Sequence, residues 1–122
     1  MRFKPALLAV FAASIAFSHL TAAHADSWGA IAVDLTKAEK EPYYGLGGGG
    51  SEDEAVKNAM KFCKDAGGET CKLAVTYNQC GAYAASHAHG GWGKAPTKAD
   101  AEAQSISGCG DDHCKVVVSD CN

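Results

Sequence analysis

The chain has 122 residues, with 11 Lys and Arg against 14 Asp and Glu, and 47% of its residues are hydrophobic. This length accommodates one small domain, and the lack of a basic stripe argues against a nucleic-acid binder and a polybasic membrane binder. The composition also excludes a large multi-domain enzyme, and it leaves the activity open.

Residues 1–25 have the organisation of a secretory signal peptide. Two positive charges in the first four residues precede an uncharged apolar run at 5–17, and Ala23-His24-Ala25 has the small residues of a cleavage site. A transmembrane anchor needs roughly 20 apolar residues, and this run is shorter. We therefore expect cleavage after Ala25, export to the periplasm or the exterior, and no membrane anchor. Residues 26–122 would form one secreted domain with a net charge of −5.

The first half of this domain, about residues 27–80, has the pattern of strand, strand, helix and strand. The helix begins at Ser51, which forms a capping box with Glu54, and its apolar residues fall on one face. The glycines at 47–50 precede the helix and are expected to form a turn. Alternating or β-branched residues predict strands at three places: residues 28–34, 43–46 and 71–77.

The second half, about residues 81–122, has the same order of elements. A strand of small residues is expected over 81–88, and glycines then turn the chain into a short strand at Trp92. Thr97 caps a second helix, and β-branched residues at 114–119 predict the last strand. Neither half could cover its apolar face alone, so we expect the two to pack together.

The six cysteines are an even set, as an oxidising compartment favours. They allow 15 pairings, and spacing alone does not choose among them. Aligning the two halves makes one set simplest, with equivalent bridges in each half and a third bridge joining the halves: Cys63–Cys71, Cys109–Cys114 and Cys80–Cys121. A zinc site is the alternative, but no pair has the C-x-x-C spacing. We expect bridges that stabilise a thin core.

These patterns predict an α+β fold. Two pseudo-symmetric strand-strand-helix-strand repeats would form one disulfide-stapled domain with a mainly antiparallel sheet. The order of elements also resembles a known family, the domain of unknown function 4189. The resemblance spans the mature chain and rests on Trp28 to Asp34, a Tyr/Trp-Gly hairpin, an Ala-rich helix ending in Cys, a Cys-Lys-hydrophobic strand, Cys80-Gly81-Ala82 and the terminal Cys121-Asn122. It implies a small, secreted, bacterial protein, and some members are exported effectors acting on host cells. It supplies no activity and no catalytic residue.

Three histidines are the candidate metal ligands. His87 and His89 would point to the same face of a strand, and His113 beside Asp111-Asp112 could complete a site if the fold brings them close. The alternative, which we favour, is a set of exposed polar residues at a strand end and a loop. We expect no cofactor.

Other catalytic patterns are weak. The glycines at 47–50 could cradle a phosphate, but the carboxylates at 52–54 would repel it. Ser86 could be a nucleophile beside His87, although no G-x-S-x-G elbow is present. Asp34, Glu54 and Asp100 could form an acid/base pair, but chance proximity among 14 acids explains them as well.

Two function classes follow. The first is a secreted, non-enzymatic binding protein, either an exported effector or a periplasmic inhibitor or immunity factor, whose acidic charge would suit a basic target. Its candidate partner patch is Tyr44 with Trp92, which the alignment places at matching hairpin positions; their alternative role is core filling. The second class is a small metal-dependent or hydrolytic protein that uses His87, His89 and His113. Convergence of these histidines in one pocket would favour the second class.

Overall fold

The computed structural model describes residues 27–36 and 42–122. The predicted signal peptide and its cleavage site lie outside the described residues. The described chain forms six strands and two helices, in the order β1 (Trp28–Asp34), β2 (Tyr43–Gly49), α1 (Glu52–Asp65), β3 (Lys72–Tyr77), β4 (Cys80–Ala85), β5 (Gly90–Ala95), α2 (Lys98–Cys109) and β6 (Lys115–Cys121).

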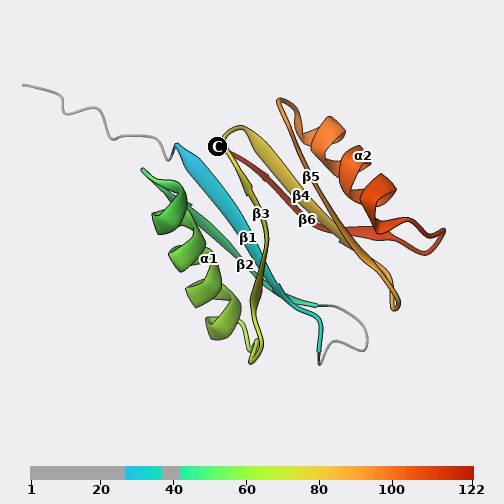
Figure 1. Cartoon of the computed structure of the whole chain (residues 1–122), viewed down its shortest axis with the longest axis horizontal. Coiled ribbons are helices and arrows are strands. Elements are labelled where there is room, and N and C mark those ends of the chain that lie inside the picture. The colour runs from blue at the N-terminus through green and yellow to red at the C-terminus, as the bar shows by residue number, and fades with distance from the viewer. Residues whose placement is uncertain (1–26, 37–41) are drawn as a thin grey trace, which may run out of the picture.

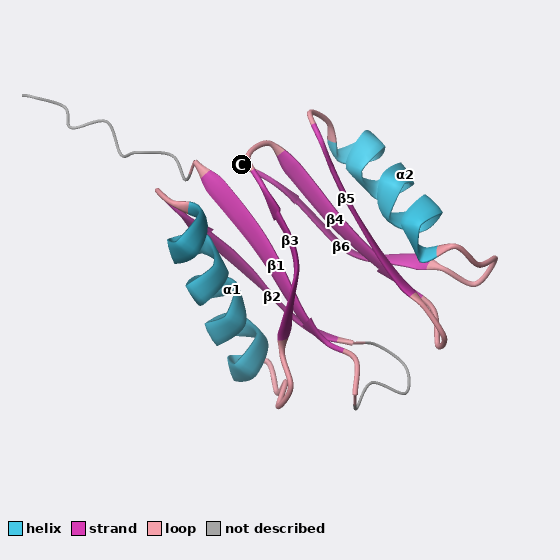
Figure 2. Cartoon of the chain, in the orientation of Figure 1, coloured by secondary structure: helices cyan, strands magenta, loops and turns pink. Residues whose placement is uncertain are grey.

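The elements form four layers, with the two sheets face to face and one helix on the outside of each (Figure 1). Helix α1 covers β1 and β2, and α2 covers β5 and β4. Figure 2 shows the helices on opposite outer sides of the strands. The central apolar layer lies between the sheets and contains Ile31, Val33, Val75, Tyr77, Tyr83 and Val118. The α+β class is therefore confirmed.

The antiparallel pairing is also confirmed, but the strands form two sheets where the sequence suggested one. The strand orders are β2-β1-β3 and β5-β4-β6, with every neighbouring pair antiparallel. The strands β3 and β4 follow each other but do not pair. Each sheet has a helix on one face and apolar side chains on the other, and that second face is covered when the sheets stack.

The glycines at 47–49 are strand residues, so the predicted turn at 47–50 is wrong over most of its length. The reason is the close approach of α1. A Cβ atom on Gly47 would lie 2.2 Å from the carbonyl oxygen of Ala55, and Gly45 meets the backbone of Ala59 in the same way. Glycine is therefore required here for helix-to-strand contact and not for chain reversal. On the other side of the molecule, Gly93 meets the carbonyl oxygen of Ala101 at 2.2 Å.

The three disulfides are Cys63–Cys71, Cys80–Cys121 and Cys109–Cys114, the same pairs that the alignment made simplest. The expected role of one bridge is wrong. Cys80 is the first residue of β4 and lies opposite Cys121 of β6, so this bridge joins two strands of one sheet and does not join the halves.

Tyr77 links the two halves instead. Its ring lies between the sheets, where a Cβ on Gly29 or Gly81 would meet it at 2.3 or 2.2 Å, and its hydroxyl donates to Asp120 of β6 at 2.8 Å. Only 1% of Tyr77 is exposed. Burial, followed by the Asp120 contact, raises the pKa of this hydroxyl well above its usual range. Nearby, the backbone N–H of Asn122 donates to the carbonyl of Gln79 at 2.8 Å.

Candidate functional site: a histidine groove

The β4–β5 turn carries two of the candidate histidines. Strand β4 ends at Ala85, so the expected strand over 81–88 is too long. Ser86 makes the turn: its backbone N–H donates to the carbonyl of His89 at 2.9 Å, and its Oγ accepts from the N–H groups of Ala88 and His89 at 3.2 and 3.0 Å. These bonds replace strand pairing. His87 and His89 therefore lie on a turn, and the strand argument for their common face does not hold.

This turn lines a groove of about 820 Å³ between the ends of β2 and β6. We call it the histidine groove. Its described lining is Leu35, Pro42, Tyr44, Ala85, Ser86, His87, Ala88, His89, Gly90, Asp112, His113, Lys115, Val116 and Val117. All three candidate histidines thus lie along one groove.

The groove does not gather these histidines into a metal site. Within residues 27–36 and 42–122, no three His, Cys, Asp or Glu side chains are grouped so that they could hold a metal ion. His89 is 61% exposed at its side chain and pairs through Nδ1 with Asp111. The three histidines therefore line the same surface, but they are not arranged to coordinate one metal ion.

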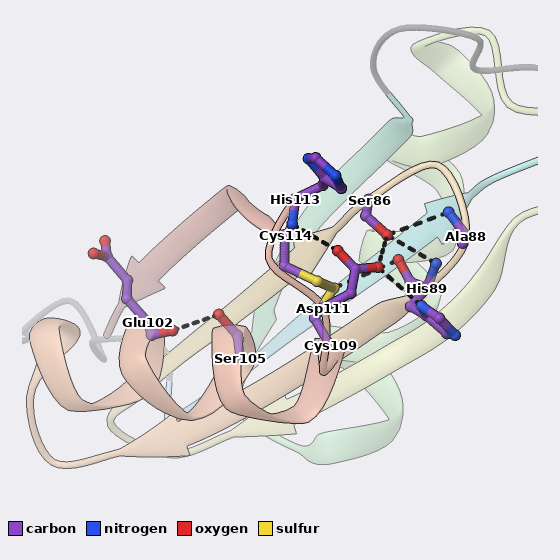
Figure 3. The surroundings of a disulfide bond; sticks show 9 residues. All are labelled: Ser86, Ala88, His89, Glu102, Ser105, Cys109, Asp111, His113 and Cys114. Carbon is purple, nitrogen blue, oxygen red and sulfur yellow. Dashed lines mark hydrogen bonds and ion pairs between the residues drawn. A yellow bond between two sulfur atoms is a disulfide. The ribbon is translucent and has the colours of Figure 1, made fainter.

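Asp111 is the centre of a polar network behind the groove (Figure 3). Its Oδ2 accepts from the Ser86 hydroxyl at 2.6 Å and contacts Nδ1 of His89 at 2.9 Å, while its Oδ1 accepts from the N–H of His113 at 2.8 Å. The Ser86 bond, followed by the His89 bond, lowers the pKa of Asp111 to about 2. The carboxylate is thus charged, and it holds the β4–β5 turn against the loop that follows α2.

That loop is short and covalently closed. Gly110 ends α2 in the left-handed conformation, with φ of 80°, and the Cys109–Cys114 disulfide spans the loop. A positive φ of this kind favours glycine. The disulfide sulfur of Cys109 lies 3.6 Å from the carbonyl oxygen of His89, so bridge, loop and turn are in contact. The groove wall is therefore held by a covalent bridge and by the hydrogen bonds of Asp111.

The network contains Ser, Asp and His, but it is not a nucleophilic triad. In a triad the histidine lies between serine and carboxylate and takes the serine proton. Here the Ser86 proton goes to Asp111, and its oxygen already accepts from two backbone N–H groups. Ser86 is thus a turn-forming residue whose oxygen is engaged by two N–H groups, and its proton faces a weakly basic carboxylate where a triad would have a histidine.

Tyr83, a core residue, places its hydroxyl against the groove residue Gly90. The residue is 5% exposed, and a Cβ on the groove residue Gly90 would lie 2.2 Å from its hydroxyl oxygen. Among the described residues this hydroxyl has no hydrogen-bond partner, unlike that of Tyr77. Burial raises the pKa of Tyr83, so the hydroxyl keeps its proton. Sequence reasoning placed Tyr83 only in a strand and missed this role.

The end of β1 that lies next to the groove residue Leu35 carries a buried carboxylate. Asp34, at the end of β1, is fully buried and accepts from the N–H groups of Thr70, Thr36 and Glu69 and from the Thr36 hydroxyl, all within 2.9 Å. These bonds, with Thr70 first, lower the pKa of Asp34 to about 2. Glu54 accepts from Gly50 at the start of α1, as a capping residue does. The carboxylates of Asp34 and Glu54, which the sequence offered as part of an acid/base pair, are therefore engaged in hydrogen bonds that hold the backbone.

The predicted aromatic pair is divided. Tyr44 is 40% exposed and lines the groove, whereas Trp92 is 53% exposed and does not line it. The two also differ in register, because Tyr44 lies opposite Val33 and Trp92 lies opposite Tyr83. Leu46 lies opposite Ile31 of the central strand, as Trp92 lies opposite Tyr83, so Leu46 and not Tyr44 is the residue that corresponds to Trp92 in position.

Fold and groove together define a small, disulfide-stapled α+β protein with a preformed, His-rich surface groove. The family comparison then places it: a model of the domain of unknown function DUF4189 matches residues 28–121, and the chain belongs to this family. The comparisons with curated proteins and with solved structures find no match. Three disulfides fit an oxidising compartment such as the periplasm or the exterior. None of the helices in the described part of the chain is long and apolar enough to cross a membrane.

Proposed function

We propose that the protein is a secreted, non-enzymatic binding factor, of the effector or periplasmic inhibitor type, whose histidine groove holds a segment of a protein partner. The observation that carries this proposal is the exposure of apolar side chains in a rigid concave surface. Leu35, Tyr44 and Val116 are 49%, 40% and 37% exposed, and all three line the groove. Exposed apolar side chains gathered in one concave surface are typical of an interaction site.

Secretion is part of the same proposal. The signal-peptide pattern over residues 1–25 supports it, with cleavage after Ala25, and the three disulfides agree with it. Mass spectrometry of the protein recovered from periplasm and medium tests it. A mature N-terminus at Asp26 is expected, and recovery only as the uncleaved cytoplasmic chain would contradict it.

We also propose that the two halves are a pseudo-symmetric repeat. Support comes from features that recur in both halves: the pairing register of the central strand shifts after Ile31 in one sheet and after Tyr83 in the other, with the extra residue on β3 or β6. In both halves a side-chain amide of the helix also bonds the backbone of an edge strand: Asn58 donates to the carbonyl of Gly48, and Gln104 accepts from the N–H of Lys94. Each contact satisfies a backbone group on an edge strand.

The metal-dependent or hydrolytic alternative has one observation in its favour, the convergence of His87, His89 and His113 along one groove. The hydrogen bonding of Ser86 and the lack of a three-ligand group in the described chain weigh against it. Retention of zinc or copper after dialysis, lost when His113 and His87 are replaced by Asn, would favour this alternative.

The test of the binding function uses two neighbouring tyrosines of β2. Tyr43 and Tyr44 are 38% and 40% exposed, but only Tyr44 lines the groove. Each position is replaced in turn by a photo-reactive phenylalanine analogue, and the oxidised protein is irradiated with periplasmic extract, host lysate or purified lysozymes. We expect one stoichiometric crosslinked partner from position 44, none from position 43, and loss of co-purification in Tyr44→Ala alone. Equal crosslinking from both positions, or none from either, would overturn the proposal.

A further inference from the structure

We propose that the partner segment held by the histidine groove is acidic and partly apolar, and that the groove binds it more tightly as the pH falls. This inference rests on the proposed function and names the chemistry of the partner.

The charge of the groove differs from the charge of the chain. The whole sequence has a formal net charge of −3, yet the groove lining contains Lys115 and three histidines against one free carboxylate, that of Asp112. The neighbouring Asp111 is already engaged by Ser86, His89 and the backbone of His113. A partner carboxylate would therefore meet donors and cations along most of this surface.

The polar and apolar groups of the groove suit one extended segment. Apolar contact is available at Leu35, Tyr44 and Val116, which are all at least one-third exposed. Tyr83 does not line the groove itself, but its side chain is held among core residues and its hydroxyl lies against the lining residue Gly90 without a partner in the described chain, so it is a donor for an oxygen that binds beside Gly90. Acidic side chains alternating with apolar ones would satisfy both sets of groups.

The pH dependence follows from the histidines. A lower pH favours the cationic form of an imidazole, so acidification adds positive charge along the groove. The charged groups that face them are Asp111 and Asp112 on the α2–β6 loop and Lys115 on β6. The described lining from β1 and β2 contributes only the Tyr44 phenol. Protonation therefore adds attraction for a carboxylate, and Asp112 offsets only part of it.

The probe is a blocked hexapeptide in which glutamate alternates with leucine, titrated into the oxidised, isotope-labelled protein and followed by amide chemical shifts at pH 8 and pH 5.5. We expect shifts at the β4–β5 turn and the α2–β6 loop, with an affinity about tenfold higher at pH 5.5. The same peptide with lysine for glutamate should not bind. Equal binding of both peptides, or an affinity that does not change with pH, would overturn the inference.

Matched variants locate the effect. Lys115→Gln removes the groove ammonium, and Lys72→Gln removes an exposed lysine that begins β3 and does not line the groove. We expect the first to weaken peptide binding about fivefold at low salt and the second to leave it unchanged, in line with charge-assisted contacts.

Tyr83→Phe should also weaken binding without lowering the melting temperature. The double variant His87→Asn, His113→Asn keeps only His89 in the groove and should show a smaller pH dependence; an unchanged pH profile would contradict the role of the two replaced side chains.

Two further arms separate this inference from the proposed function. A short single-stranded DNA that bound as well as the acidic peptide would point to a general anion site and overturn the peptide assignment. If a protein partner crosslinks at position 44 but its binding neither depends on pH nor weakens in Lys115→Gln, the binding function stands and the acidic partner is wrong. Absence of a partner at position 44, with no acidic peptide bound, would overturn both.

Discussion

The two halves of the molecule close the same corner in opposite ways. In the first half, the strand supplies the carboxylate: Asp34 is fully buried and accepts from the backbone of the loop before β3. In the second half, the loop supplies the carboxylate: Asp111 reaches back to Ser86 and His89 beyond the end of β4. The first arrangement leaves nothing for a ligand. The second leaves the turn outside, with His87 and part of His89 exposed to the groove.

The two halves therefore contribute differently to the groove: the second half supplies its histidines and Lys115, whereas the first half supplies apolar lining through Leu35 and Tyr44. Both halves share helix-to-strand contacts through glycine and a disulfide that connects the helix end to the next strand. The halves differ in the position of the carboxylate, which lies on the strand in the first half (Asp34) and on the loop after the helix in the second (Asp111). The same scaffold therefore carries a fully buried carboxylate in one half and an exposed histidine turn in the other.

The largest effects are expected from the disulfides. Replacing both Cys80 and Cys121 by Ala should lower the free energy of unfolding by about 4 kcal/mol, and replacing Cys109 and Cys114 by about 2 kcal/mol, because the loop-closure entropy grows with loop length. The sequence separations are 41 and 5 residues. Urea denaturation of the oxidised proteins measures both values.

The same variants separate structure from surface. Peptide binding at the groove should be lost without Cys109–Cys114 and kept without Cys63–Cys71, whose separation of 8 residues gives a similar entropy. Equal loss of binding in both would show that the groove depends on the stability of the whole fold and not on the loop that Cys109–Cys114 closes.

Disturbing the contact between helix and strand is expected to lower the stability of the protein by the same amount in either half. Gly47→Ala and Gly93→Ala each place a methyl group 2.2 Å from a helix carbonyl oxygen, and we expect each to destabilise the protein by about 3 kcal/mol. Gly50→Ala is the control, because its nearest atom is the end of the Glu54 side chain at 3.9 Å. A thermal melt in which the control loses as much stability would contradict the packing explanation.

The two buried tyrosines should respond differently to loss of their hydroxyls. Tyr77→Phe removes the bond to Asp120 and should lower the free energy of unfolding by about 2 kcal/mol. Tyr83→Phe removes a hydroxyl without a partner in the described chain, and a change below about 0.5 kcal/mol is expected. Denaturant midpoints decide between them, and a Tyr83 effect as large as that of Tyr77 would mean that this hydroxyl is needed for folding.

Much of the fold could be predicted from the sequence, because caps and alternation are local. Ser51 and Thr97 both cap helices as expected, each accepting from the N–H three residues later. The run Gly47–Gly49 was misjudged, because the reason for its glycines is a helix that packs against it from elsewhere in the chain. A run of alternate glycines opposite an Ala-rich helix could have indicated this.

The site was harder to predict, because it depends on which loops meet. The histidines were identified as candidates, but their common groove arises from the turn at Ser86 and the loop at Asp111, and no local pattern fixes that contact. Tyr83 was missed for the same reason: strand alternation places it inside, yet its hydroxyl reaches Gly90 only through the β4–β5 pairing. Aligning the two halves on the glycines that contact the helices, Gly47 and Gly93, would have matched Trp92 with Leu46 and not with Tyr44.

The smallest expected effect is confined to acidic pH and compares the two corner carboxylates. The pKa of Asp34 and that of Asp111 are each about 2 in the folded protein, below the value near 3.9 of an unfolded Asp. As the pH falls from about 4 to about 2, the unfolded chain therefore binds protons first, and stability present above pH 4 is lost. Asp34→Asn and Asp111→Asn should each reduce the slope of stability against pH in this window. Asp111→Asn should weaken the groove more than Asp34→Asn, because Asp111 bonds Ser86 and His89 of the β4–β5 turn, whereas the hydrogen bonds of Asp34 go to Thr36, Glu69 and Thr70. If Asp34→Asn does not fold, NMR titration of the native carboxyl replaces it, and a midpoint near 3.9 would contradict the account of the closed corner.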